Sequence, residues 1–262
     1  MFNRIKTEKI NDHIWLMNDA DEGTGYLVTG SRSALVIDTM NGYENVKQLA
    51  ETLTGLPLTV VNTHGHPDHI YGDVYFEEVY MHPDDHALAK QYMHLPVFKE
   101  EMERRGLKIP RLLSVREGDC FELGGIALEV YHVPGHTPGG ICLLDRKDRL
   151  LFTGDSVIEQ TWMQMDESLT MQVFLESLES LGKIRGEFDH ILTGHTRKYP
   201  EDASLCEAQR RAVKEVLDGK NEDDMPYKWY GGSAMAHPYG PEPRRIVYRR
   251  DRLEKERKET AQ

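Results

Sequence analysis

One short segment, residues 63–69 (T-H-G-H-P-D-H), constrains this chain more than any other feature, because it carries three histidines and an aspartate. It directly follows a short apolar run, which is typical of a strand that ends in a loop. Imidazole and carboxylate are ligands that zinc and similar divalent ions prefer. In an extended backbone, His64 and His66 point to the same side because strand side chains alternate with a period of two. A proline then turns the chain, so Asp68 and His69 face a second point and one loop can serve two metal ions.

Three later residues of the same chemical kind also follow apolar runs. His136, Asp155 and His195 each come directly after a glycine at the end of such a run. Loops at strand ends gather to build sites, and glycine lets the backbone approach a metal or ligand closely. We therefore expect these three residues to join residues 63–69 in one site. The other histidines are interpreted as ordinary surface or core residues: His13, His82, His86, His94, His190 and His237.

In order and approximate spacing, these motifs resemble those of the metallo-β-lactamase-fold hydrolase superfamily. The resemblance runs from about residue 10 to residue 200 and includes Asp38, which ends the apolar run at 34–37. It implies an α/β fold in which two sheets lie between outer helices, a four-layer αβ/βα sandwich. The residues after about 220 carry no such resemblance.

The resemblance also implies a binuclear metal centre with seven ligands. The first ion would be held by three imidazoles: His64, His66 and His136. The second would be held by a carboxylate and two imidazoles: Asp68, His69 and His195. Asp155 would bridge the two ions, and Asp38 would orient a ligand histidine from behind; its alternative interpretation is an exposed aspartate at a strand end. Zinc is the expected metal, with iron or manganese as alternatives.

This ligand set indicates a hydrolase. Two divalent ions about 3.5–4 Å apart lower the pKa of a shared water towards neutrality, which provides a metal-bridging hydroxide at working pH. Asp68, as the catalytic residue, would hydrogen-bond this hydroxide and direct it at a small ester-type bond. No Gly-x-Ser-x-Gly motif points to a serine nucleophile instead. The resemblance favours a thioester, as in glyoxalase II, or a lactone as the substrate.

Several alternatives stay open. Glyoxalase II enzymes often carry T-H-H-H-x-D-H, whereas this chain has Gly65 as the middle residue and lacks their glutathione-gripping C-terminal pattern. Phosphodiester cleavage suits a two-metal site equally well. A mono-iron oxidoreductase similar to persulfide dioxygenases keeps the same motif, but flavodiiron relatives carry Glu at the position of His66 and are disfavoured. The complete ligand set argues against a non-catalytic scaffold stabilised by metal.

Charge and hydropathy limit the partners. Acidic residues exceed basic residues by 44 to 32, a net charge of −12, so binding to nucleic acid is not expected. No apolar run is long enough to span a membrane, and the first residues lack the hydrophobic core of a signal peptide. We therefore expect a cytoplasmic enzyme with a small-molecule substrate. The oligomeric state stays open, a homodimer included.

Hydrophobic periodicity predicts strands that alternate with helices. Strands are expected at 26–29, 34–37, 58–62, 78–81, 126–132, 141–144 and 149–153. Helices are expected at 43–54, 83–106, 171–182 and 201–218. These elements belong to a predicted catalytic domain over residues 1–220.

Two insertions and the end of the chain remain. Residues 83–106 and 157–171 are expected to set substrate choice, and residues 162–165 (W-M-Q-M) are candidates for the pocket lining. Residues 221–262 form a predicted C-terminal extension that packs on the same domain. It is expected to contain an aromatic covering loop at 227–241, an exposed strand at 244–250 and a charged tail that is partly disordered.

Overall fold

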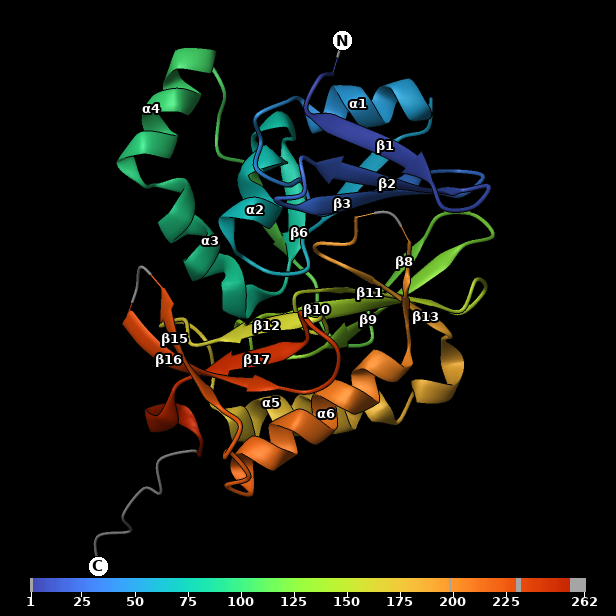
Figure 1. Ribbon diagram of the computed structural model, residues 1–262. Coiled ribbons are helices and arrows are strands. Elements are labelled where there is room, and N and C mark those ends of the chain that lie inside the picture. The colour runs from blue at the N-terminus through green and yellow to red at the C-terminus, as the bar shows by residue number, and fades with distance from the viewer. Residues whose placement is uncertain (1, 198, 230–231, 255–262) are drawn as a thin grey trace, which may run out of the picture.

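Two β-sheets face each other in the computed structural model, which describes residues 2–197, 199–229 and 232–254 (Figure 1). The first sheet has its seven strands in chain order, antiparallel up to β4 and parallel from there on. These strands are β1 (Ile5–Lys9), β2 (Ile14–Asp19), β3 (Thr24–Thr29), β4 (Ala34–Ile37), β5 (Leu58–Val61), β6 (Glu78–Met81) and β7 (Arg111–Ser114).

The second sheet has six strands in the order β14-β13-β11-β10-β9-β8. All neighbours in it are antiparallel except β11 and β13, which are parallel. Its strands are β8 (Cys120–Glu122), β9 (Ala127–His132), β10 (Ile141–Asp145), β11 (Leu150–Gly154), β13 (His190–Thr193) and β14 (Glu201–Asp202). Because β9, β11 and β13 run in the same direction, their carboxyl ends meet at one edge of the sheet.

Helices cover the outer face of each sheet (Figure 1). Helix α1 (Val46–Leu53) buries Val46, Leu49 and Ala50 against the first sheet, while α5 (Met171–Gly182) and α6 (Ser204–Leu217) bury their apolar faces against the second. Between the sheets, Tyr26 and Phe152 meet edge to face with ring centroids 5.1 Å apart. The layers therefore follow the order helix, sheet, sheet, helix, which is the predicted αβ/βα sandwich.

The helix predicted over 83–106 is in fact two helices, α3 (His86–Met93) and α4 (Pro96–Arg105). Pro96 has no backbone N–H and cannot continue a helix, but it suits the first position of a new one. The shorter helices are α2 (Pro67–Ile70) and the 3₁₀ segments η1 (Tyr71–Tyr75), η2 (Pro83–Asp85), η3 (Arg185–Glu187) and η4 (Arg250–Arg252). Within the described part of the chain, every helix is too short or too polar to cross a lipid bilayer.

The end of the chain forms a third sheet that was not predicted. Most of the described residues in the predicted covering loop at 227–241 belong instead to two strands, β15 (Met225–Trp229) and β16 (Gly232–Pro238). The strand predicted at 244–250 is present as β17 (Arg245–Tyr248), but the prediction that it is exposed is wrong. It lies between β16 and β12 (Gln160–Met163). Its residues 246–248 are at most 1% exposed because they pack on both faces of this sheet.

The boundary predicted at residue 220 stays a prediction. Strand β12 precedes this boundary and β17 follows it, and the two pair in parallel. The segment after residue 220 therefore shares a sheet with the chain before it. The predicted disordered tail falls mainly on residues 255–262, which lie outside the described residues.

Candidate metal centre

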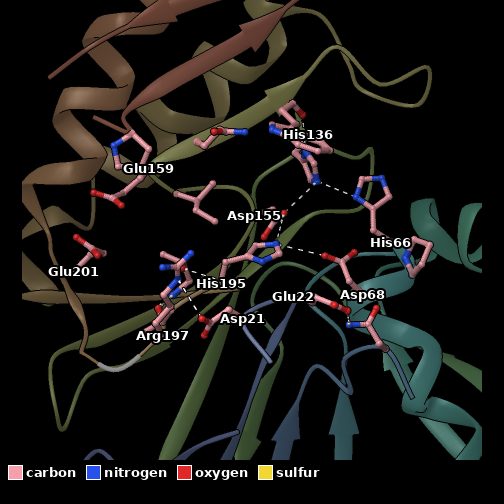
Figure 2. A pocket seen from close by; sticks show the side chains of 18 of the residues that line it. Asp21, Glu22, His66, Asp68, His136, Asp155, Glu159, His195, Arg197 and Glu201 are labelled. Atoms are coloured by element: carbon pink, nitrogen blue, oxygen red, sulfur yellow. Dashed lines mark hydrogen bonds and ion pairs between the residues drawn. The ribbon is translucent and has the colours of Figure 1, made fainter. Parts of the chain in front are cut away.

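The seven predicted ligands lie beyond the carboxyl ends of strands from both sheets, and Figure 2 shows five of them: His66, Asp68, His136, Asp155 and His195. His64 and His66 lie in the bend after β5, and Asp68 and His69 follow in α2, which begins at a proline. The second sheet contributes one residue after each of β9, β11 and β13: His136, Asp155 and His195. Side chains more than 100 residues apart are thus brought to one place by the facing of the two sheets.

The ligand atoms form three overlapping groups, each within 4.8 Å. The groups are His64, His66 and His136; Asp68, His69 and His195; and His64, His69 and Asp155. The carboxylate of Asp155 approaches Nε2 of His136 at 3.7 Å, of His195 at 3.4 Å and of His69 at 3.6 Å. This position between the first two groups is the one that a bridging carboxylate requires.

Several of the inward-facing atoms have no hydrogen-bond partner among the described residues. They are His64 Nε2, His69 Nε2 and Asp155 Oδ1, all buried. A buried polar group without a partner costs about 1–3 kcal/mol. Divalent ions at the centre would satisfy these atoms together, and imidazole with carboxylate is a donor set that zinc accepts. The residues therefore fit two divalent ions, although their role as ligands stays a prediction.

Asp38 fixes one imidazole from behind. It is 1% exposed and accepts hydrogen bonds from Thr63 N at 2.7 Å, from Thr63 Oγ1 at 2.7 Å and from His69 Nδ1 at 2.9 Å. With its proton held on Nδ1, His69 presents the lone pair of Nε2 to the centre. The alternative interpretation of Asp38, an exposed residue at a strand end, is wrong.

Two further imidazoles are held by the same principle. Nδ1 of His136 donates to the carbonyl of Trp162 at 2.6 Å. Nδ1 of His64 lies 3.1 Å from Thr63 Oγ1, whose own proton goes to Asp38, so this nitrogen is the donor. Both rings therefore turn Nε2 towards the centre.

The fourth imidazole, that of His66, has Glu167 as its partner, which no local sequence pattern indicates. Oε1 of Glu167 lies 2.8 Å from Nε2 of His66 and accepts a second hydrogen bond from the Tyr92 hydroxyl at 3.0 Å. Burial disfavours the charge on Glu167, but the hydrogen bonds from His66, its own backbone and Tyr92, together with the charge of His66, outweigh burial and lower the pKa to about 2. The only local signal is an acidic residue in the insertion after Asp155.

Charge differs between the two halves of the centre. Burial, together with the neighbouring imidazoles, lowers the pKa of His64 and brings that of His136 to about 4. Both rings are thus neutral, the form that binds metals. Burial also opposes charge on His69, but Asp68 and Asp38 raise its pKa to about 10. Positive charge is therefore stabilised around His69, and a divalent ion would supply it.

A cavity of about 960 Å³ opens over the centre (Figure 2). Its floor contains His66, Asp68, His136, Asp155 and His195. Apolar and aromatic walls come from Tyr92, Ile158, Trp162, Met165, Tyr199 and Pro243. Charged groups at the walls and rim are Asp21, Glu22, Glu159, Arg197 and Glu201. Of the four residues predicted as lining, Trp162 and Met165 line the cavity, whereas Met163 is buried in the core.

The glycine that replaces the middle histidine has a structural reason. A Cβ on Gly65 would lie 3.2 Å from the carbonyl oxygen of Asp85 and 3.3 Å from the backbone nitrogen of Ala89. Helix α3 and the turn before it therefore pack directly on this position. A histidine there would displace the helix.

We expect Gly65→Ala to lower the free energy of unfolding by about 1–3 kcal/mol, the usual cost of overpacking. Gly55→Ala is the matched control, because a Cβ there meets no atom within 4 Å. Urea unfolding of both variants checks this. Equal unfolding midpoints would show that α3 shifts at no cost, and that the close packing of α3 is not the reason for a glycine at position 65.

Comparison with known proteins agrees with this geometry. The family model described as the metallo-beta-lactamase superfamily matches residues 19–218. The acyl-coenzyme A thioesterase MBLAC2 of Gallus gallus is 29% identical over 196 residues, 65% of this chain and 71% of that protein. The hydroxyacylglutathione hydrolase of Hyphomonas neptunium is 28% identical over 216 residues, 79% of this chain and 77% of that protein.

Solved structures with a similar fold carry the same family description. A metallo-beta-lactamase family protein from Thermus thermophilus superposes with a TM-score of 0.62 at 20% identity, over 84% of this chain and 86% of that one. The metallo-beta-lactamase from Pontibacter korlensis superposes with a TM-score of 0.61 at 18% identity, over 80% of this chain and 99% of that one. Because the family model matches residues 19–218, more than half of the chain, the chain belongs to the metallo-β-lactamase superfamily.

Proposed function

We propose that this metal-dependent hydrolase cleaves small thioesters at a centre of two divalent ions, zinc first among them. The observation that carries the proposal is the convergence of two groups of ligand-type side chains, with the carboxylate of Asp155 between them, 3.7 Å from His136 and 3.4 Å from His195. The relatives support the choice of bond, since they include an acyl-coenzyme A thioesterase and a hydroxyacylglutathione hydrolase. A location in the cytoplasm is part of the same proposal.

The chemistry divides between the ions and the chain. Two divalent ions bound here would lower the pKa of a water molecule towards 7 and polarise the thioester carbonyl. Asp68 reaches into the cavity with 31% of its side chain exposed, and its Oδ2 lies 3.4 Å from Nε2 of His195. As a carboxylate acceptor it orients the attacking water and takes its proton. Trp162 and Met165 supply apolar wall beside this region.

The leaving group favours a thioester over an unactivated ester. A thiol has a pKa of about 8.5, so a thiolate departs near neutral pH without a proton donor. An alkoxide needs one. The hydroxyl of Tyr92 in the cavity wall already donates to Glu167. Thioester cleavage thus needs less proton donation from these residues than ester cleavage does.

A phosphodiester fits the cavity less well. Four carboxylates of the walls and rim, Asp21, Glu22, Glu159 and Glu201, surround its entrance. Among the described lining residues Arg197 is the one side chain of fixed positive charge, and it lies 4.0 Å from Asp21. Like charges repel an anionic substrate on approach. Phosphodiesterase activity therefore stays the second candidate, because two metals suit its chemistry.

The test combines metal analysis with a substrate panel on the purified protein. We expect two zinc, manganese or iron ions per chain, and kcat/KM for S-acyl thioesters above that for lactones, phosphodiesters and β-lactams. Preferred cleavage of a phosphodiester would overturn the thioester assignment. One tightly bound iron, together with oxygen uptake on a persulfide, would replace the hydrolase by an oxidoreductase.

Substrate choice should depend on Trp162 and Met165. Trimming both to Ala removes apolar wall without touching a ligand, since His136 bonds only the backbone carbonyl of Trp162. We expect kcat/KM for long apolar acyl groups to fall on the order of tenfold and that for acetyl thioesters to change less. Metal content should be unchanged.

Tyr227→Ala is the control for this prediction. Tyr227, on the opposite edge strand of the same sheet, packs against the same apolar cluster as Trp162 but is not among the residues that line the cavity. A loss in the Trp162 and Met165 variant that is equal for all acyl groups, and matched by Tyr227→Ala, would mean that these residues only support the fold.

A further inference from the structure

The imidazole of His66 is oriented differently from its neighbours. Its Nδ1 lies 2.9 Å from Nε2 of His136, within the group that would hold the first ion. Its Nε2 points away from the centre to Glu167 Oε1 at 2.8 Å. Whereas His64 and His69 turn Nε2 inward, His66 turns Nδ1 inward. The proton on Nε2 is therefore donated to Glu167, and this bond selects both the ring orientation and the tautomer.

Glu167 is held by a second donor as well. Tyr92 in α3 donates its hydroxyl to the same Oε1 at 3.0 Å, and its ring stands edge-on to His66 with the centroids 6.0 Å apart. The side chain of Glu167 is 16% exposed. The carboxylate thus lies between two donors, His66 and Tyr92, with little access for water to compete.

The loop that carries Glu167 is fastened by the end of the chain. Arg252, in η4, donates through Nη1 to the carbonyl oxygens of Met165 at 3.0 Å, Asp166 at 2.7 Å and Ser168 at 2.8 Å. These carbonyls flank Glu167 on both sides. Ser168 in turn donates to the carbonyl of His136 at 2.9 Å. One guanidinium therefore fixes the backbone on which Glu167 stands.

We propose that Glu167 is a positioning residue for His66, and that Arg252 of the C-terminal segment holds Glu167 in place. The segment after residue 220 then has a function at the metal centre although it supplies no ligand: it determines how firmly the first ion is bound. This inference rests on the metal centre in the proposed function, but not on the identity of the substrate.

The test measures affinity for the first zinc ion by competition with a chromophoric chelator, together with the absorption spectrum of the cobalt-substituted protein. We expect Glu167→Ala to weaken the first site by about 10–100-fold and to alter the cobalt spectrum. Glu167→Gln should recover part of the affinity, because its amide oxygen still accepts the proton of Nε2. Tyr92→Phe should have a smaller effect in the same direction.

Arg252→Ala should also weaken the first site, and its effect should nearly vanish in the Glu167→Ala background. Such non-additivity is expected when two residues act through one contact. Arg245→Ala is the matched control, since Arg245 is another arginine of the C-terminal segment but bonds the carbonyl of Pro243 instead. It should retain wild-type affinity for the first ion.

The outcomes separate the inference from the proposed function. Wild-type affinity in Glu167→Ala would overturn the positioning role. An additive loss in the double variant, or a lower melting temperature of Arg252→Ala without a change in metal affinity, would overturn the role of the C-terminal segment. A wild-type protein that binds no divalent ion would overturn the inference and the metal centre together. Ordinary metal binding with no thioesterase activity would contradict the substrate alone.

Discussion

Asp155→Ala should abolish metal binding and activity together. Its carboxylate is the one that approaches histidines of both groups, so its removal leaves each ion one ligand short. Stabilisation of transition-state charge by metal is worth several kcal/mol, and each factor of ten corresponds to about 1.4 kcal/mol. We therefore expect kcat/KM to fall by at least about 10³-fold and the zinc content to fall below one ion per chain.

The contrast with Asp68→Asn makes this prediction specific. Asp68 approaches His69 and His195 of one group, whereas Asp155 also approaches His136 of the other. Its variant should keep the first ion, lose occupancy of the second and lower kcat. Asp189→Ala, which removes an exposed carboxylate paired with Arg149, is the control and should change neither quantity. Retention of both ions in Asp155→Ala would show that this carboxylate does not bridge them.

The second large effect is expected for Asp38→Ala. Three buried donors lose their acceptor: the backbone nitrogen and hydroxyl of Thr63 and Nδ1 of His69. We expect a loss of about 2–4 kcal/mol in the free energy of unfolding, because unpaired buried donors keep their full desolvation cost. Affinity for the second ion should fall about 10–100-fold, since His69 is no longer held in orientation or tautomer.

A buried carboxylate elsewhere separates the two consequences. Asp145 is fully buried at the β10–β11 turn and accepts hydrogen bonds from the backbone of Lys147 and Asp148, away from the metal centre. Asp145→Ala should destabilise the fold and leave metal affinity unchanged. Urea unfolding and zinc competition on both variants provide the measurement. If Asp38→Ala loses stability but keeps its affinity for the second ion, Asp38 supports the fold rather than the ligand.

The ligand-type residues could be located from the sequence because they cluster in the short segments that follow strands. His64 and His195, for example, come three residues after β5 and two residues after β13, so the strand ends largely fix where they lie. The strand fixes the position, and the residue type names the chemistry. Asp38 was identified for the same reason. The sandwich followed from the same pattern of strands and outer helices, once the resemblance had chosen among α/β layouts.

Glu167 and Tyr92 could not be found in this way. Glu167 is separated in sequence from His66 by 101 residues and from Tyr92 by 75 residues. Both Glu167 and Tyr92 belong to insertions rather than to the strands of the two sheets. Only the folded insertions bring them together. The prediction that β17 is exposed was wrong for a related reason, because its short apolar run lies among arginines, which are typical of an exposed strand. Its burial depends on β12 and β16, distant partners that no local pattern specifies. The break at Pro96 was not predicted either, but the sequence does contain its signal, because proline cannot continue a helix.

The parallel pairing of β12 with β17 has a consequence for how the cavity is made during synthesis. Strand β12 carries Trp162 in the cavity wall, but its partner begins only at Arg245. While the ribosome is still adding the residues between them, β12 is an unpaired edge with open backbone donors and acceptors. All seven ligand-type residues precede Arg245 in the chain, so they are synthesised before the partner of β12. The cavity wall that contains Trp162 can therefore be completed only after every ligand-type residue has been made.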